Sequence, residues 1–162
     1  MQNKPRSCVP CTGCCDGWVQ MVIEDKPVYP GHGCQHSTCK GCAIYERRPV
    51  DPCDNFNCGW VMENSPLPMW MKPNKGKVIV IFNKLDWNGL PVDLAVPVGR
   101  RIPPKSLKWL MKFAEENMRP LIYTEQIIEN GGFSKQQQMA GYGPPAFQED
   151  VLLWQQEGRK FW

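Results

Sequence analysis

The sequence predicts an α+β protein: a small Cys-rich, metal-bound N-terminal module packed on a β-β-α-β domain with a C-terminal helix. Two observations predict this class. All nine cysteines lie between Cys8 and Cys58, and the later residues change from strand patterns to a helical pattern and back. We therefore expect a metal or iron–sulfur binding module over residues 1–60 and a small α+β domain over residues 61–162.

Length and composition allow a real hydrophobic core. The chain has 162 residues, 42% of them hydrophobic and 22% charged, which is ordinary for a globular protein. The net charge of +3 neither demands nor excludes nucleic acid as a partner. No run approaches ~18 apolar residues and no apolar signal segment opens the chain, so neither a membrane span nor secretion is expected. A cytoplasmic location follows as an expectation, and it would keep thiols reduced.

The cysteines favour metal binding over disulfides. Their number is odd, so a scheme made only of disulfides leaves one sulfur without a partner. Reducing surroundings also disfavour disulfides. Redox-active thiols are a third, less favoured interpretation.

Two close cysteine pairs have the spacing of metal knuckles. They are Cys8-x2-Cys11 and Cys39-x2-Cys42, and Cys53-x4-Cys58 is a looser third pair. Two intervening residues let a tight turn direct both sulfurs at one ion, and zinc takes four such ligands in a tetrahedron. The two pairs are too far apart in sequence for a compact zinc ribbon.

The first cysteines also resemble the triplet that holds a [4Fe–4S] cluster, Cys8-x2-Cys11-x2-Cys14. The ferredoxin pattern fails at its end, because Cys15 follows Cys14 directly. Adjacent side chains leave the backbone in different directions, so Cys14 and Cys15 are expected to serve different metals, or one of them packs. Eight thiolates would fill two four-coordinate sites and leave one spare. The candidate ligands are Cys8, Cys11, Cys14, Cys15, Cys34, Cys39, Cys42, Cys53 and Cys58.

Spacing does not separate zinc from iron, because cysteine ligation suits both. His32 and His36 flank Cys34 and are alternative ligands, although hydrogen-bonding loop histidines are the favoured interpretation. No known catalytic motif is present, so whether the protein is an enzyme stays open.

The N-terminal motifs resemble those of one known family. Cys8-x2-Cys11-x2-Cys14-Cys15 is followed by Cys42-Ala43-Ile44-Tyr45-Glu46-Arg47-Arg48-Pro49 and then Cys53. This order is similar to the CxxCxxCC family of zinc- or iron-chelating proteins, over about residues 8 to 60. Three residues separate Pro49 from Cys53 where the family more often has two.

The resemblance implies zinc or an iron–sulfur cluster, with [4Fe–4S] the favoured cluster type, in a cytoplasmic protein. Some larger relatives are flagellin lysine methylases, so an iron–sulfur-dependent redox or methyl-transfer enzyme is an alternative. Arg48 is interpreted as structural support that donates to thiolates or carbonyls and offsets the negative charge of the site.

Several short elements are expected in order along the chain. Residues 18–23 read as a short strand, and residues 59–77 as an irregular connector whose Trp60 and Trp70 pack on the metal module. Residues 77–82 are a buried strand by their β-branched content. Asn88-Gly89 then predicts a hairpin to a second strand over residues 90–98.

Prolines shape the expectations for the following segment. Pro91 and Pro97 place the second strand at a sheet edge or interrupt it. Pro103-Pro104 opens a helix that runs to about Met118. Its apolar residues share one face and are interpreted as core contacts with the sheet: Leu107, Leu110, Met111, Ala114 and Met118.

The C-terminal third is expected to be simpler. A third strand covers residues 121–123, and the glycines at 131–132 and 141–143 are interpreted as loops. A terminal helix over residues 147–156 is expected to turn Leu152 and Leu153 inward. The basic-aromatic tail is expected to fold back on the domain or to fray.

Positive charge suggests one further function. Arg100 and Arg101 stand beside Lys105 and Lys108, and such a patch suits nucleic-acid contact, although a solvated face is favoured. A zinc-folded interaction module that binds nucleic acid or an unknown protein partner is therefore a second alternative. No membrane partner is expected.

Overall fold

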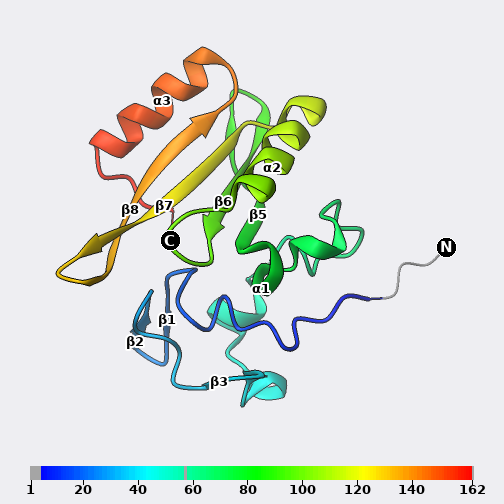
Figure 1. Ribbon diagram of the computed structural model, residues 1–162, viewed down its shortest axis with the longest axis vertical. Coiled ribbons are helices and arrows are strands. Elements are labelled where there is room, and N and C mark those ends of the chain that lie inside the picture. The colour runs from blue at the N-terminus through cyan, green and yellow to red at the C-terminus, as the bar shows by residue number, and fades with distance from the viewer. Residues whose placement is uncertain (1–4, 57, 162) are drawn as a thin grey trace.

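The computed structural model describes residues 5–56 and 58–161 and confirms an α+β protein. A four-stranded sheet carries a helix on each face, and the cysteine-rich segment lies across one end of the sheet (Figure 1). The sheet is built from residues after the last cysteine.

The sheet has the strand order β5-β6-β7-β8. The strands are β5 (Val78–Trp87), β6 (Leu90–Pro97), β7 (Leu121–Glu129) and β8 (Gly132–Tyr142). The β5–β6 and β7–β8 pairs are antiparallel, and β6–β7 is parallel. The parallel pair needs a crossover connection, and helix α2 supplies it.

Helix α2 (Pro104–Asn117) covers one face of the sheet, where Leu110 and Ala114 are buried. Helix α3 (Pro145–Gln156) covers the other face, where Phe147 and Val151 are fully buried. The strand residues alternate between the two cores: Val78 and Val80 face α2, whereas Ile79 belongs to the core under α3. Both faces are therefore apolar, which is why β5 and β6 read as nearly continuous hydrophobic runs.

Both hairpins use the same two-residue turn. Asn88 and Gly89 have φ of 50° and 81°, as the predicted hairpin requires. Asn130 and Gly131, with φ of 51° and 77°, make the same turn between β7 and β8. The expected loops at the C-terminal glycines are therefore right only in part: Gly131 lies in this turn and Gly143 lies between β8 and α3, but Gly132 and Gly141 belong to β8. Its Gln-rich run lacks the β-branched residues that mark a strand.

The prediction that β6 lies at an edge is also wrong. β6 pairs on both sides, but its parallel ladder with β7 covers only residues 93–95. Pro91 and Pro97 lie outside that short ladder, so their missing N–H groups cost no hydrogen bond to β7. The two prolines pair with Asp86 and Val78 of β5 in the antiparallel ladder.

Three residues that were expected in the core are exposed. Leu152 and Leu153 are 59% and 51% exposed, because Phe147 and Val151 set the buried face of α3 one helical turn apart. Met118 is 72% exposed, since it ends α2 in the left-handed conformation and leaves the helical stripe. The tail does fold back, with Phe161 packed beside Trp154. Trp162 lies outside the described residues.

The connector contains two short elements, η3 (Met69–Met71) and α1 (Pro73–Gly76). Trp60, Leu67 and Met71 are buried in the core beneath α2. Trp60 also lines a small hollow beside four cysteines, so it lies between the sheet and the cysteine-rich segment.

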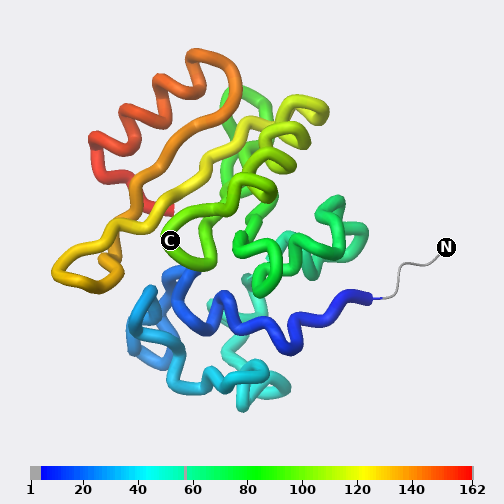
Figure 2. The backbone as a smooth tube through the Cα atoms, viewed as in Figure 1, coloured from blue at the N-terminus to red at the C-terminus, as the bar shows by residue number. Residues whose placement is uncertain are grey.

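The cysteine-rich segment has little regular structure (Figure 2). Its elements are β1 (Met21–Ile23), β2 (Lys26–Val28), β3 (Ser37–Thr38), β4 (Gly41–Cys42), η1 (Tyr45–Arg47) and η2 (Val50–Asp54). β1 corresponds to the later part of the predicted strand. Trp18 meets Phe133 edge to face with ring centroids 5.1 Å apart, so the β7–β8 hairpin packs on this segment. In the described part of the chain no helix is long and apolar enough to cross a membrane.

Gly141 allows α3 to lie close to β8. A Cβ atom at this position would come within 2.8 Å of Val151 Cγ2 and 3.3 Å of Phe147 Cε1. We expect Gly141→Ala to lower the free energy of unfolding by about 1–3 kcal/mol, the usual cost of overpacking. Urea denaturation measures this. Gly132→Ala on the same strand is the matched control, since its nearest neighbour is 4.0 Å away. An equal effect of both substitutions would contradict the packing argument.

Candidate metal centre

Eight of the nine cysteines line one cavity of about 260 Å³. They come from the N-terminal loop, the β1–β4 region, η2 and the start of the connector: Cys8, Cys11, Cys14, Cys15, Cys34, Cys42, Cys53 and Cys58. Cys39 does not line the cavity and is exposed. All nine are free thiols. Residues far apart in the sequence thus present sulfur to a common space.

The sulfurs fall into two groups of four. Cys8, Cys11, Cys14 and Cys58 also line a smaller hollow that contains none of the other described cysteines. Cys15, Cys34 and Cys53 pack in one small apolar cluster. Cys42 belongs with the second group, because its charge acts on the pKa values of both Cys34 and Cys53. Cys14 and Cys15 join the groups, and their sulfurs share a hydrogen bond.

Tight turns produce this arrangement. The N–H of Cys11 donates to the carbonyl of Cys8 at 2.6 Å, which closes the first knuckle. The N–H of Cys34 donates to the carbonyl of Cys15 at 2.7 Å and brings the second loop against the first. Gly17, with φ of 90°, lies where a Cβ atom would be 2.2 Å from the Tyr29 carbonyl oxygen. Glycine there permits this close approach of the two chain segments.

Backbone N–H groups point at two of the sulfurs. The N–H of His36 donates to Cys34 Sγ at 3.4 Å. The N–H groups of Trp60 and Val61 donate to the sulfur of Cys58 and favour its thiolate. Hydrogen bonds to sulfur tune a bound metal centre and hold its ligands in place. One member of each four-thiol group therefore already has this support.

Burial keeps most of these thiols protonated in the absence of a cation. It raises the pKa of Cys8, Cys34 and Cys53, and it raises that of Cys58 to about 11. Cys15 is the exception. The Cys14 thiol donates to its sulfur and lowers the pKa of Cys15 to about 7, so the pKa of Cys14 is raised in turn. A metal ion would replace these protons and release them to solvent.

Two cations lie beside the sulfurs: Arg48 lines the cavity, and Lys72 lines the smaller hollow. Arg48 donates to the Tyr45 carbonyl at 2.8 Å, pairs with Asp54 at 2.6 Å and lies 4.1 Å from the Tyr45 ring centroid. Lys72 Nζ donates to the carbonyl of Val9 at 2.7 Å. Both side chains lower the pKa of Cys8 against the larger effect of burial. Arg48 makes the expected hydrogen bond to a carbonyl, whereas its role beside a bound metal stays a prediction. Lys72 was not singled out from sequence because it lies in the connector.

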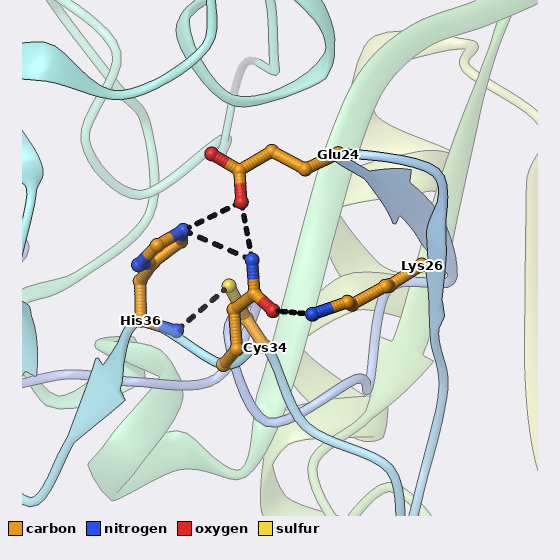
Figure 3. A network of polar contacts seen from close by, with 5 residues as sticks. Glu24, Lys26, Cys34 and His36 are labelled. Carbon is orange, nitrogen blue, oxygen red and sulfur yellow. Dashed lines mark hydrogen bonds and ion pairs between the residues drawn. The ribbon is translucent and has the colours of Figure 1, made fainter.

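The two histidines differ in position. His32 is exposed, packs on the Tyr29 ring and does not line the cavity. His36 lines the cavity, but its Nε2 lies 3.0 Å from Glu24 Oε2 (Figure 3). Gln35 joins the same network by donating to Glu24 and accepting from Lys26. The contact with His36 lowers the pKa of Glu24. This network fixes the loop that carries Cys34.

The cavity does not hold a finished coordination shell. Among residues 5–56 and 58–161, no three His, Cys, Asp or Glu side chains already form a group that could hold a metal ion. The donor set itself fits soft thiophilic metals, because eight cysteine thiols and one imidazole line the cavity. A single torsion, χ1, places each Sγ, so metal binding would require changes in the χ1 angles of side chains that already line one cavity.

The positive patch is partly neutralised. Arg101 forms an ion pair with Glu125, and Arg100 lies 3.9 Å from the same carboxylate. Lys105 Nζ lies 4.3 Å from the ring centroid of Trp70. The charge available for a phosphate backbone is therefore smaller than the sequence suggests.

Comparisons with protein-family models, with curated proteins and with solved structures gave no match to this chain. The resemblance to the CxxCxxCC family therefore stays a prediction, and it rests on the residues quoted for it.

Proposed function

We propose that this protein binds metal through clustered thiolates, as zinc or as an iron–sulfur cluster, at two adjacent sites. One site would use Cys8, Cys11, Cys14 and Cys58. The other would use Cys15, Cys34, Cys42 and Cys53. The observation that carries the proposal is the cavity lined by eight sulfurs from four parts of the chain. Cys39 would be the spare cysteine, and a reducing cytoplasm would keep the set available.

The chain places positive side chains and N–H donors beside the two groups of thiolates. A site with four thiolates carries net negative charge around either metal, and Arg48 and Lys72 lie where they offset it. N–H donors at Cys34 and Cys58 stabilise the thiolate form. When bound, zinc would supply a fixed tetrahedral crosslink, whereas an iron–sulfur cluster would supply electron transfer. The resemblance of the first three cysteines to a [4Fe–4S] triplet favours the cluster at the first site.

Elemental analysis of protein purified without oxygen tests the proposal. We expect either two zinc ions per chain, or iron and sulfide in equal amounts with a visible absorption band. One zinc ion together with one iron–sulfur cluster per chain would also fit two separate sites. Less than one metal atom per chain would overturn the proposal. The grouped, buried cysteines would then only pack against one another.

A further inference from the structure

A second cavity, of about 220 Å³, lies where the sheet, the end of α3 and the cysteine-rich segment meet. Its walls come from β6, β7, β8, the residues after α3, and Gln20, which stands just before β1. Gln20 Nε2 donates to the Lys135 carbonyl at 2.6 Å and ties the two regions together at its edge. The next residue, Met21, lines the sulfur cavity instead. The two cavities therefore border the same short segment.

Two buried polar groups that line this cavity have no partner within the described chain. Thr124 is only 5% exposed, and its Oγ1 makes no hydrogen bond there. Gln137 Nε2 is likewise buried and without a partner. Buried polar atoms are normally paired, since each unpaired one costs stability. This hydroxyl and this amide N–H₂, which lie beside the same cavity, are therefore donors with which a ligand could pair.

The charges at the cavity have one sign. Lys135, Arg159 and Lys160 line it, and the described lining residues include no aspartate or glutamate. None of the three is in an ion pair with a carboxylate of residues 5–56 or 58–161.

Arg159 is held in place by stacking. Its guanidinium carbon lies 4.6 Å from the Trp154 ring centroid and 5.4 Å from that of Phe161. Stacking on rings leaves the N–H groups at the guanidinium edge able to donate. A cation fixed in this way loses less side-chain freedom when it binds an anion.

We propose that this cavity binds a small organic molecule carrying an oxyanion, either a carboxylate or a phosphate. Lys135, Arg159 and Lys160 attract its charge, and Thr124 and Gln137 donate hydrogen bonds to it. Leu94, Ile127, Met139 and Phe161 supply an apolar wall for its carbon skeleton. The site is independent of metal, because none of its lining residues is a cysteine or histidine.

Calorimetric titration of the full chain tests this site with sodium phosphate, disodium succinate and sodium chloride at matched ionic strength. We expect phosphate or succinate to bind, and whichever binds identifies the oxyanion. Thr124→Val should weaken binding at least tenfold without lowering the melting temperature, because valine keeps the volume and removes the unpaired hydroxyl. Gln137→Met provides a second variant with the same expected loss.

Arg101→Gln is the matched control, since Arg101 is exposed, paired with Glu125 and outside this cavity. Its affinity for the anion should stay within twofold of the unaltered chain. Arg159→Gln, in contrast, should weaken binding at least tenfold. Equal affinities of all variants, or heats no greater than those with chloride, would overturn the proposal. Loss of metal in a separate cysteine variant would leave this result unchanged.

Discussion

Replacing Cys58 by serine is expected to empty one of the two proposed metal sites, which halves the metal content of the purified chain where both sites hold the same metal centre. Cys58 lines the cavity and the smaller hollow with Cys8, Cys11 and Cys14, and it receives the N–H groups of Trp60 and Val61. A serine hydroxyl is a poor ligand for zinc or iron, so the site that uses Cys58 should empty. The other site should keep its metal. Elemental analysis after gel filtration gives the ratio.

Cys39→Ser is the matched control, because Cys39 is exposed and lies outside the cavity. Its metal content should equal that of the unaltered chain. Cys34→Ser should instead empty the other site, and Cys58→Ser with Cys34→Ser should remove nearly all of the metal. If Cys58→Ser alone emptied the protein, the sulfurs would form one site or two that fill together. If it removed nothing, the assignment of Cys58 as a ligand would be wrong.

Loss of one site should also loosen the cysteine-rich segment. Structural zinc is worth about 10–16 kcal/mol in small zinc-folded peptides, so a site of that kind contributes a large share of local stability. The segment has few regular elements of its own, whereas the sheet has two apolar cores. We therefore expect the sheet to survive metal loss.

The sequence predicted the first half of the sheet from local chemistry. β-branched residues marked β5, and Asn88-Gly89 specified the turn to β6. The second hairpin carried the same Asn-Gly signal at residues 130–131, but its strand was hidden by a polar Gln-rich run. That strand lies at the edge of the sheet, where one side of its ladder is unpaired, so its composition differs from that of the inner strands.

The candidate site was predicted in part. The spacing of the cysteines in the sequence identified the thiols and predicted different roles for Cys14 and Cys15. In the structure, Cys14 lies in one group of sulfurs and Cys15 in the other. The spacing did not reveal which distant cysteines group with Cys14 and which with Cys15. This grouping depends on long-range contacts, such as the one between the Cys34 N–H and the Cys15 carbonyl. The second cavity, proposed above to bind an oxyanion, was missed altogether. Its residues are scattered from Gln20 to Phe161 and share no motif.

Asp93→Ala is expected to have the largest effect on the stability of the sheet. Asp93 is 3% exposed, and both of its carboxylate oxygens accept from Arg119, at 2.6 and 2.8 Å. Oδ1 also accepts from the N–H of Asn83, at a bulge in β5, and Arg119 donates to Asn83 Oδ1. The pair thus joins β5, β6 and the residues between α2 and β7. The interaction also raises the pKa of Arg119.

Alanine at position 93 leaves the Arg119 guanidinium, whose side chain is 20% exposed, without its counter-ion and the Asn83 N–H without an acceptor. Removing one member of a buried ion pair costs about 3–5 kcal/mol, and urea denaturation at neutral pH should show a loss of that size.

Glu125→Ala is the control, because its partners are exposed arginines and such pairs contribute about 1 kcal/mol or less. Asp93→Ala with Arg119→Ala should cost less than the two single substitutions added together, since it leaves no unpaired cation. Additive losses would mean that Asp93 and Arg119 act separately, and that the Asn83 bulge is held by packing.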